Sequence, residues 1–277
     1  MNIFQAIILG IVQGLTEFLP ISSSAHLFLI PKIFNWEYQG LGFDVALHWG
    51  TLLSVLIIFG QDYIKYIKAI LASLFRPPAA VASGQTLEHQ ATTRDKQLGW
   101  YLVLATVPAA FFGFFFESQL ETTFRNPWIV VAMLMVFALL LWIADNSVRA
   151  SDDSGTSQLT WGKSFAIGLS QALALVPGVS RSGVTITAGI FAGLSRKSAA
   201  RFSFLLLGPI AFGAGLVTLP DLDIVTSELI VSFIASAVSG YLAIKFLLRY
   251  VATRSYKIFV WYRIAFALLV AVTLLIK

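Results

Sequence analysis

The chain has 277 residues, of which 57% are apolar and 12% are charged, and this balance excludes a soluble globular protein. Its net charge of +5 comes from Lys and Arg in short loops between apolar runs, so it does not indicate a nucleic-acid partner. The absence of cysteine excludes disulfides and thiolate metal sites. Several uncharged runs have the roughly 17–25 residues that a transmembrane helix needs. The predicted fold class is therefore an all-α, polytopic membrane protein.

The first apolar segment, residues 2–33, is interrupted by a polar break. Pro20 disfavours a helical conformation at Leu19, so the first helix is expected to end there. The three serines at 22–24 are N-cap candidates for a second helix of about 12 residues. Such a helix is about 18 Å long and cannot cross a hydrocarbon core of about 30 Å. We therefore predict a re-entrant helical hairpin rather than two crossings.

Six transmembrane helices are predicted after this hairpin, at about residues 43–60, 97–116, 127–144, 200–219, 228–249 and 256–276. Between the first two lies a longer segment, residues 61–96. Its first part, residues 62–75, has lysines among apolar residues and is predicted as an interfacial helix, followed by a polar cytoplasmic loop. Residues 164–195 repeat the short–break–short pattern with a Pro-Gly pair at the break. They are predicted to form a second re-entrant hairpin.

The two hairpins belong to an internal repeat. At an offset of 158 residues, the matching pairs are Gly10 and Gly168, Gln13 and Gln171, Ser22 and Ser180, Ser24 and Ser182, Leu47 and Leu205, and Gly50 and Gly208. After the long loop the offset becomes 129, where Ile129 matches Ile258. The repeat halves, about 1–144 and 160–277, each contain a hairpin and three crossings. Because three is odd, we predict an inverted repeat within a single integral-membrane domain, residues 1–277.

The loop charges predict the orientation in the membrane. Thirteen Lys and Arg residues lie in the loops on one side and three on the other. The positive-inside rule places the thirteen in the cytoplasm, so both termini are expected to face outward. The first hairpin then enters from outside and the second from the cytoplasm. Their tips can meet within the membrane.

Polar side chains gather at the break of the first hairpin. Gln13 and Glu17 are four residues apart and share one helix face. A carboxylate at membrane depth costs about 2.5–3.5 kcal/mol on insertion scales, which indicates a partner or a function for Glu17. His26 lies one turn after Ser22 and Ser23, where its imidazole can serve in catalysis. The alternatives are a Glu17 that snorkels outward or hydrogen-bonds to a neighbouring helix, a structural role for His26, and ordinary N-capping by the serines.

The second hairpin adds a cation. Arg181 lies within Ser180-Arg181-Ser182-Gly183, directly before the next short helix, and Thr185 is one turn later. Two helix N-termini that point at one place favour a bound anion, and a guanidinium binds phosphate or carboxylate through two parallel hydrogen bonds. The alternative is a structural ion pair with the carboxylate of the first hairpin, which is compatible with a functional role.

Together these groups indicate phosphoryl transfer on an anionic substrate. The hard oxygen ligands of Glu17 and Gln13 predict Mg²⁺ or Ca²⁺, rather than zinc, between the protein and the phosphates. His48, in the first crossing, is a weaker candidate for the site. Asp44 is expected at the membrane interface.

At these residues the chain resembles the undecaprenyl-pyrophosphate phosphatase family of the bacitracin-resistance type. Two motifs carry the resemblance: residues 13–26, QGLTEFLPISSSAH, and residues 177–185, PGVSRSGVT. Ser24-Ala25 stands where many members have Thr-Gly, and Gln13 leaves Glu17 as the only carboxylate of the first motif. The resemblance covers essentially the whole chain.

The resemblance implies hydrolysis of undecaprenyl (C55-isoprenyl) pyrophosphate to undecaprenyl phosphate, the lipid carrier of cell-wall synthesis. It also implies a divalent cation, resistance to bacitracin on overproduction, and an outward-facing site in a bacterial plasma membrane. A homodimer is left open. The rival class is a lipid-phosphate flippase or anion transporter, because inverted repeats with broken helices are also transporter architecture.

In the phosphatase hypothesis, Glu17 holds the cation with help from Gln13, and Arg181 and the helix ends bind the diphosphate. Either Ser23 or His26 attacks the terminal phosphorus, and the other assists. The remaining substrate-binding candidates are Ser22, Ser24, Ser180, Ser182, Gly183 and Thr185.

Overall fold

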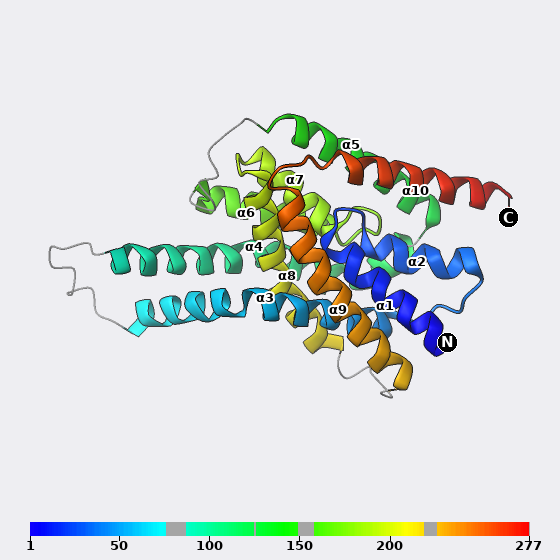
Figure 1. Ribbon diagram of the computed structural model, residues 1–277, viewed down its shortest axis with the longest axis horizontal. Coiled ribbons are helices and arrows are strands. Elements are labelled where there is room, and N and C mark those ends of the chain that lie inside the picture. The colour runs from blue at the N-terminus through cyan, green and yellow to red at the C-terminus, as the bar shows by residue number, and fades with distance from the viewer. Residues whose placement is uncertain (76–86, 125, 149–157, 219–225, 277) are drawn as a thin grey trace.

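A computed structural model describes residues 1–75, 87–124, 126–148, 158–218 and 226–276, and the regular structure in these ranges is helical (Figure 1). In chain order the helices are α1 (Ile3–Phe18), α2 (Ser23–Phe34), α3 (Leu41–Phe75), α4 (Leu87–Thr123), α5 (Pro127–Asn146), α6 (Trp161–Leu173), α7 (Arg181–Phe191), α8 (Arg196–Thr218), α9 (Ser227–Tyr250) and α10 (Lys257–Ile276). The predicted all-α fold class is confirmed.

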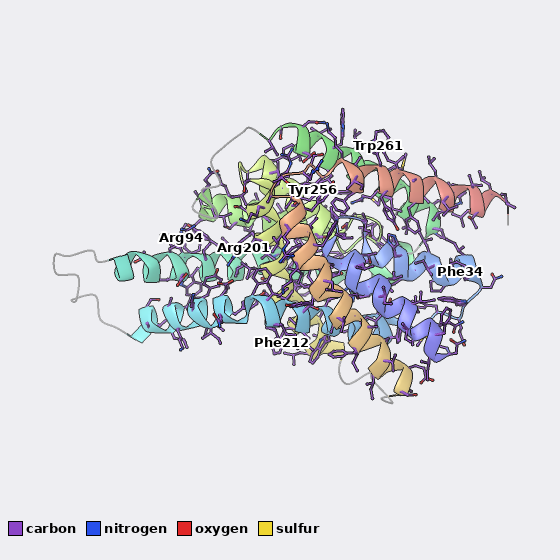
Figure 2. All side chains as sticks on the ribbon, viewed as in Figure 1. Phe34, Arg94, Arg201, Phe212, Tyr256 and Trp261 are labelled. Carbon is purple, nitrogen blue, oxygen red and sulfur yellow. The ribbon has the colours of Figure 1, made fainter. Side chains whose placement is uncertain are left out.

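Six helices are long and apolar enough to cross a membrane, namely α3, α4, α5, α8, α9 and α10. They coincide with the six predicted crossings. Large apolar side chains lie on their outer faces, as Figure 2 shows for Phe212 and Trp261, which are more than half exposed. Such faces are unfavourable in water and suit contact with lipid. The chain is a multi-pass membrane protein.

The remaining helices, α1, α2, α6 and α7, have 16, 12, 13 and 11 residues. The longest is therefore about 24 Å long at 1.5 Å per residue, which is less than the thickness of a hydrocarbon core. α1 ends at Phe18, and Leu19 is extended because Pro20 follows it. α1 packs on α2, and α6 on α7, so each pair forms a hairpin of two short helices. This geometry is consistent with re-entrant hairpins; their entry from opposite sides stays a prediction.

The segment between the first two crossings differs from its prediction. Residues 62–75 continue α3 without a break instead of forming a separate interfacial helix. Part of the predicted polar loop lies outside the described residues, but from Leu87 the chain is already helical as the first turns of α4. No proline interrupts either stretch, and α3 and α4 pack side by side (Figure 1), so each helix has a partner along its length. Packing with a partner helix stabilises segments whose own sequence is only weakly helical.

The first helix of each hairpin packs against a long helix of the other half. α1 lies along α9, and its counterpart α6 lies along α4, the counterpart of α9. Gly10 and Gly168, which are equivalent in the repeat, lie at these two contacts. A Cβ atom on Gly10 would overlap the carbonyl oxygen of Ser232, and one on Gly168 would overlap that of Ala105. Small residues thus permit the close approach by which membrane helices associate.

We predict that Gly10→Ala and Gly168→Ala each lower the free energy of unfolding by about 1–3 kcal/mol, because the added methyl group must displace backbone atoms. Gly60→Ala is the matched control, since a Cβ atom there has no neighbour within 4 Å. Thermal unfolding in detergent measures all three. An equal loss of stability in Gly60→Ala would contradict this account of the packing.

Candidate active site

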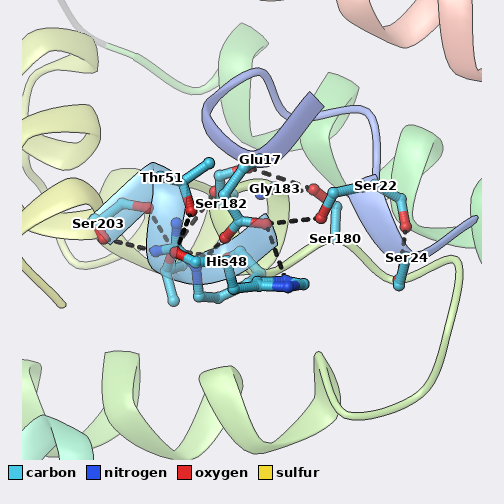
Figure 3. A network of polar contacts seen from close by, with 12 residues as sticks. Glu17, Ser22, Ser24, His48, Thr51, Ser180, Ser182, Gly183 and Ser203 are labelled. Atoms are coloured by element: carbon cyan, nitrogen blue, oxygen red, sulfur yellow. Dashed lines mark hydrogen bonds and ion pairs between the residues drawn. The ribbon is translucent and has the colours of Figure 1, made fainter. Parts of the chain in front are cut away.

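The turns of the two hairpins have the same local geometry. Ser22 and Ser180, which are equivalent in the repeat, are the N-caps of α2 and α7, and each has a φ of 75°. Each Oγ accepts the backbone N–H three residues later, at 3.4 Å and 3.1 Å. The hydroxyls of Ser22 and Ser24 are 3.3 Å apart, as are those of Ser180 and Ser182 (Figure 3). The repeat predicted from the sequence is therefore present in the backbone and the hydrogen bonds of both turns.

A buried carboxylate lies at the centre of the site. Glu17, which is 4% exposed, accepts a hydrogen bond from Ser23 Oγ at 2.6 Å and one from Gln13 Nε2 at 3.2 Å, both on Oε2. Arg181 Nε donates to Oε1 at 3.0 Å. His48 Nε2 lies 3.4 Å from Oε2, and Figure 3 shows His48 beside Glu17 in this network. Side chains from α1, α2, α3 and α7 thus meet at one carboxylate.

The two halves contribute unlike groups from equivalent positions. Ser23 and Arg181 are the first residues of α2 and α7, and 158 residues separate them. The position equivalent to Glu17 is occupied by Leu175 in the second hairpin. The first half therefore supplies the carboxylate and a hydroxyl, and the second half supplies the guanidinium. The predicted meeting of the two loops is confirmed for Glu17, Ser23 and Arg181.

Two polar atoms beside this carboxylate are buried and have no hydrogen-bond partner among the described residues. One is Arg181 Nη2, a donor, whose neighbour Nη1 donates to the Ser203 carbonyl at 2.6 Å. The other is Gln13 Oε1, an acceptor. Buried polar atoms without partners are rare and cost about 1–3 kcal/mol each. A ligand with an anionic group for Arg181 and a cation for Gln13 would satisfy both.

The oxygen atoms of Glu17 and Gln13 fit a divalent cation that is shared with a substrate. In the described part of the chain, no three His, Asp or Glu side chains form a group that could hold a metal by itself. Mg²⁺ is commonly held by one or two carboxylates together with the phosphates of its substrate. The free Gln13 Oε1 next to Glu17 is consistent with such a shared site.

His26 lies in a different environment from the one expected of a nucleophile. It is 2% exposed; its Nδ1 is 2.7 Å from the Ser22 carbonyl and its Nε2 is 2.8 Å from the Tyr262 hydroxyl. Its ring stacks on Phe266 with a centroid distance of 4.2 Å. Both ring nitrogens are thus engaged, Nδ1 within the first turn of α2 and Nε2 with α10, and neither contact reaches Glu17 or Ser23. A catalytic role for His26 stays a prediction.

Three of the other predicted binding residues make contacts within the protein. Ser182 Oγ donates to the Leu19 carbonyl at 3.1 Å and so joins the two turns. The N–H of Gly183 is used in capping α7. Thr185 Oγ1 lies 2.7 Å from Ser203 Oγ on α8. Because these contacts are internal to the protein, substrate binding by these groups stays a prediction.

Two residues outside the motifs also belong to this region. His48 reaches Glu17 directly, although the sequence ranks it only as a weaker candidate. Arg263 is fully buried and contacts the backbone of both turns, and sequence reasoning did not single it out. An ionisable side chain inside a predicted crossing is the signal that could have found both, because such residues are costly in a membrane.

Residues 6–269 match the family model described as bacitracin resistance protein BacA. The chain belongs to this family. It is 47% identical over 274 residues to an undecaprenyl-diphosphatase of Pelotomaculum thermopropionicum, with 98% of this chain and 97% of the relative covered. A relative of the same name from Moorella thermoacetica is 45% identical over 98% of this chain and 97% of its own length.

A third relative, the undecaprenyl-diphosphatase of Desulforudis audaxviator, is 42% identical, and the alignment covers 100% of both chains. The BacA match includes both hairpin turns, residues 13–26 and 177–185, on which the resemblance was based. The predicted family is therefore confirmed.

In this BacA-family protein we predict that Arg181→Lys lowers kcat/KM for phosphate release by about 10²–10³-fold, as expected for the loss of a preorganised donor to developing charge. The three N–H donors of an ammonium share one nitrogen, so they cannot reproduce the separate positions from which Nε, Nη1 and Nη2 of Arg181 reach Glu17, Ser203 and the ligand. Arg201→Lys is the matched control, because Arg201 pairs with Asp62 on an exposed surface. Near wild-type activity in Arg181→Lys would exclude the guanidinium from the reaction.

Proposed function

We propose that the protein hydrolyses undecaprenyl pyrophosphate to undecaprenyl phosphate and inorganic phosphate at the two hairpin turns, and so recycles the cell-wall lipid carrier. The observation that carries this proposal is the buried Glu17 carboxylate, whose two oxygens contact a serine of one turn and an arginine of the other. The curated relatives named undecaprenyl-diphosphatase support the substrate and the reaction.

The diphosphate binds where the N-termini of α2 and α7 converge. The dipoles of both helices favour an anion there, and the unpartnered Nη2 of Arg181 supplies a charged hydrogen-bond donor. Glu17 accepts a hydrogen bond from Nε of the guanidinium, and the Ser203 carbonyl accepts one from Nη1. The guanidinium is therefore oriented before the substrate binds. The isoprenyl tail remains among the apolar side chains and lipid around the helices.

In the reaction, Ser23 Oγ attacks the terminal phosphorus while its proton passes to Glu17 Oε2, to which it already donates at 2.6 Å. The bond from that phosphorus to the bridging oxygen breaks, and undecaprenyl phosphate leaves. Water then attacks the phosphoserine, the Oγ–phosphorus bond breaks, and Ser23 regains a proton. The hydrogen bond to Glu17 supports Ser23 as the nucleophile. For His26 to act instead, its Nε2 must leave the Tyr262 hydroxyl.

A divalent cation, Mg²⁺ or Ca²⁺, would be held by Glu17 and Gln13. When bound, it would neutralise charge on the diphosphate and polarise its phosphoryl oxygens. The hard oxygen donors and the unpartnered Gln13 Oε1 support this assignment. The neighbouring imidazole of His48 contributes a further polar group at the same carboxylate.

We further propose that the site opens to the outer side of a bacterial plasma membrane and that overproduction confers bacitracin resistance. The excess of Lys and Arg in the loops assigned to the cytoplasm supports the orientation. The description of the family as a bacitracin resistance protein supports the resistance.

Transport is the second candidate function. It is favoured by the packing of each half on the other, α1 on α9 and α6 on α4. Related packing of two repeat halves allows alternating access in transporters. In that function the same turns would bind the head group and release it unchanged.

We predict that the purified protein releases phosphate from undecaprenyl pyrophosphate in detergent and that a chelator suppresses this release. Glu17→Ala is expected to abolish phosphate release, because the variant loses the carboxylate that contacts both Ser23 and Arg181. Phosphate detection with defined substrate measures this. Substrate that crosses liposomes without phosphate release would instead support transport. Release that survives chelation would remove the cation from the proposal.

We predict that rapid-quench experiments with substrate labelled at the terminal phosphate trap the label on Ser23, because its hydroxyl is oriented by Glu17. Ser23→Ala is expected to form no labelled protein, whereas His26→Gln should still form it. Label recovered as phosphohistidine would overturn the serine mechanism.

A further inference from the structure

The centre of the protein contains a cation that the proposed reaction does not use. Arg263 of α10 is 0% exposed, and no Asp or Glu lies within ion-pair distance of it in the part of the chain that the structure describes. Its N–H groups instead face five backbone carbonyls: Nε that of Leu134 at 3.2 Å, Nη1 that of Pro20 at 3.4 Å, and Nη2 those of Met133, Gly178 and Val179 at 3.4, 2.8 and 3.1 Å.

Two of these carbonyls, those of Pro20 and Gly178, come from equivalent positions of the two halves. Pro20 and Gly178 are separated by the 158-residue offset, and each lies two residues before the serine that caps α2 or α7. Leu134 and Arg263 are separated by the 129-residue offset. One side chain therefore lies between the two halves and bonds the same position in both turns. The planar guanidinium reaches the two equivalent carbonyls through different nitrogens, Nη1 to Pro20 and Nη2 to Gly178.

We propose that Arg263 is a positioning residue that holds the two hairpin turns in register, so that Ser23 and Arg181 meet at Glu17. The inference rests on the proposed function. Because the hydrogen bonds of Arg263 go to backbone carbonyls, we infer that it acts through the turns and not on the substrate. The charge of Arg263 is buried, and burying a charge is unfavourable unless the charged group is hydrogen-bonded. Here the hydrogen bonds go to carbonyl groups of the turns, so the guanidinium and the turns stabilise each other.

The second turn is fitted closely around this contact. Gly178 has a φ of 97°, a region that residues with a Cβ atom rarely adopt, and a Cβ atom there would lie 2.6 Å from the Val130 carbonyl oxygen. The turn is thus pressed against α5 on one side and bonded to Arg263 on the other. Displacing it would move the Gly178 carbonyl away from the guanidinium and release the link to Pro20.

The test uses Arg263→Lys in the full-length protein, with hydrogen-exchange mass spectrometry and steady-state kinetics. An ammonium cannot reach carbonyls on both sides, so amide exchange is expected to rise about tenfold or more in both turns, residues 18–26 and 176–184. kcat/KM for phosphate release is expected to fall about 10²-fold, as misplacement of reacting groups by about 1 Å can do. If Arg263 only joined α10 to α5, the substitution would leave amide exchange in the first turn unchanged, and the proposal would be wrong.

Arg196→Gln is the control, because it breaks a partly buried pair with Asp145 at 2.6 Å that involves neither turn. It is expected to lower thermal stability without faster exchange in the turns or a lower kcat/KM. If both turns in Arg263→Lys exchange as in the wild type, the proposal is wrong, whatever the activity.

Gly178→Ala decides the question if Arg263→Lys fails to accumulate. Of the two turns it alters only the second directly, through its contact with α5, yet the shared guanidinium predicts faster exchange in the first turn as well. Faster exchange confined to residues 176–184 would overturn the proposal. A wild-type protein that releases no phosphate would refute the proposed function, while the exchange measurements would still decide the role of Arg263.

Discussion

The interaction on which the rest of the structure depends is the contact of the two hairpin turns at the Glu17 carboxylate. Its oxygens are divided between Ser23, at the start of α2, and Arg181, at the start of α7. A buried carboxylate without these partners would be strongly unfavourable, and so would the buried guanidinium. The two hairpins are therefore stable in this arrangement only together. The long helices serve to bring them to one place.

The repeat explains how a nearly symmetric frame yields an asymmetric site. Both turns use a serine with the same positive φ, the same capping bond and the same neighbouring hydroxyl. Both first helices pack through a glycine against the opposite half. The chemistry arises where equivalent positions differ, as with Glu17 and Leu175, or Ser23 and Arg181. An anionic ligand then meets a hydroxyl on one side and a cation on the other.

Much of the fold could be predicted because the bilayer imposes simple limits on length and polarity. Pro20 ends α1 for a local steric reason, the second break contains Pro177-Gly178 although α6 already ends at Leu173, and the six spans follow from their uncharged runs. The prediction failed over residues 62–75, where lysines lie among apolar residues and α3 continues, and from Leu87, where the sequence is polar but α4 has already begun. There the helices α3 and α4 support each other, and such mutual packing has no signature within a short window.

The sequence by itself determined the membrane class, the two hairpins and the motif residues Gln13, Glu17, Ser23 and Arg181, because composition, helix breakers and polar residues at membrane depth are local properties. Only the tertiary structure decided which imidazole meets Glu17. His48 does so from α3, whereas His26 turns toward Tyr262 and Phe266. It alone also revealed Arg263 between the turns. These contacts join residues up to about 240 positions apart, and their partners are mostly backbone carbonyls, which any residue type carries.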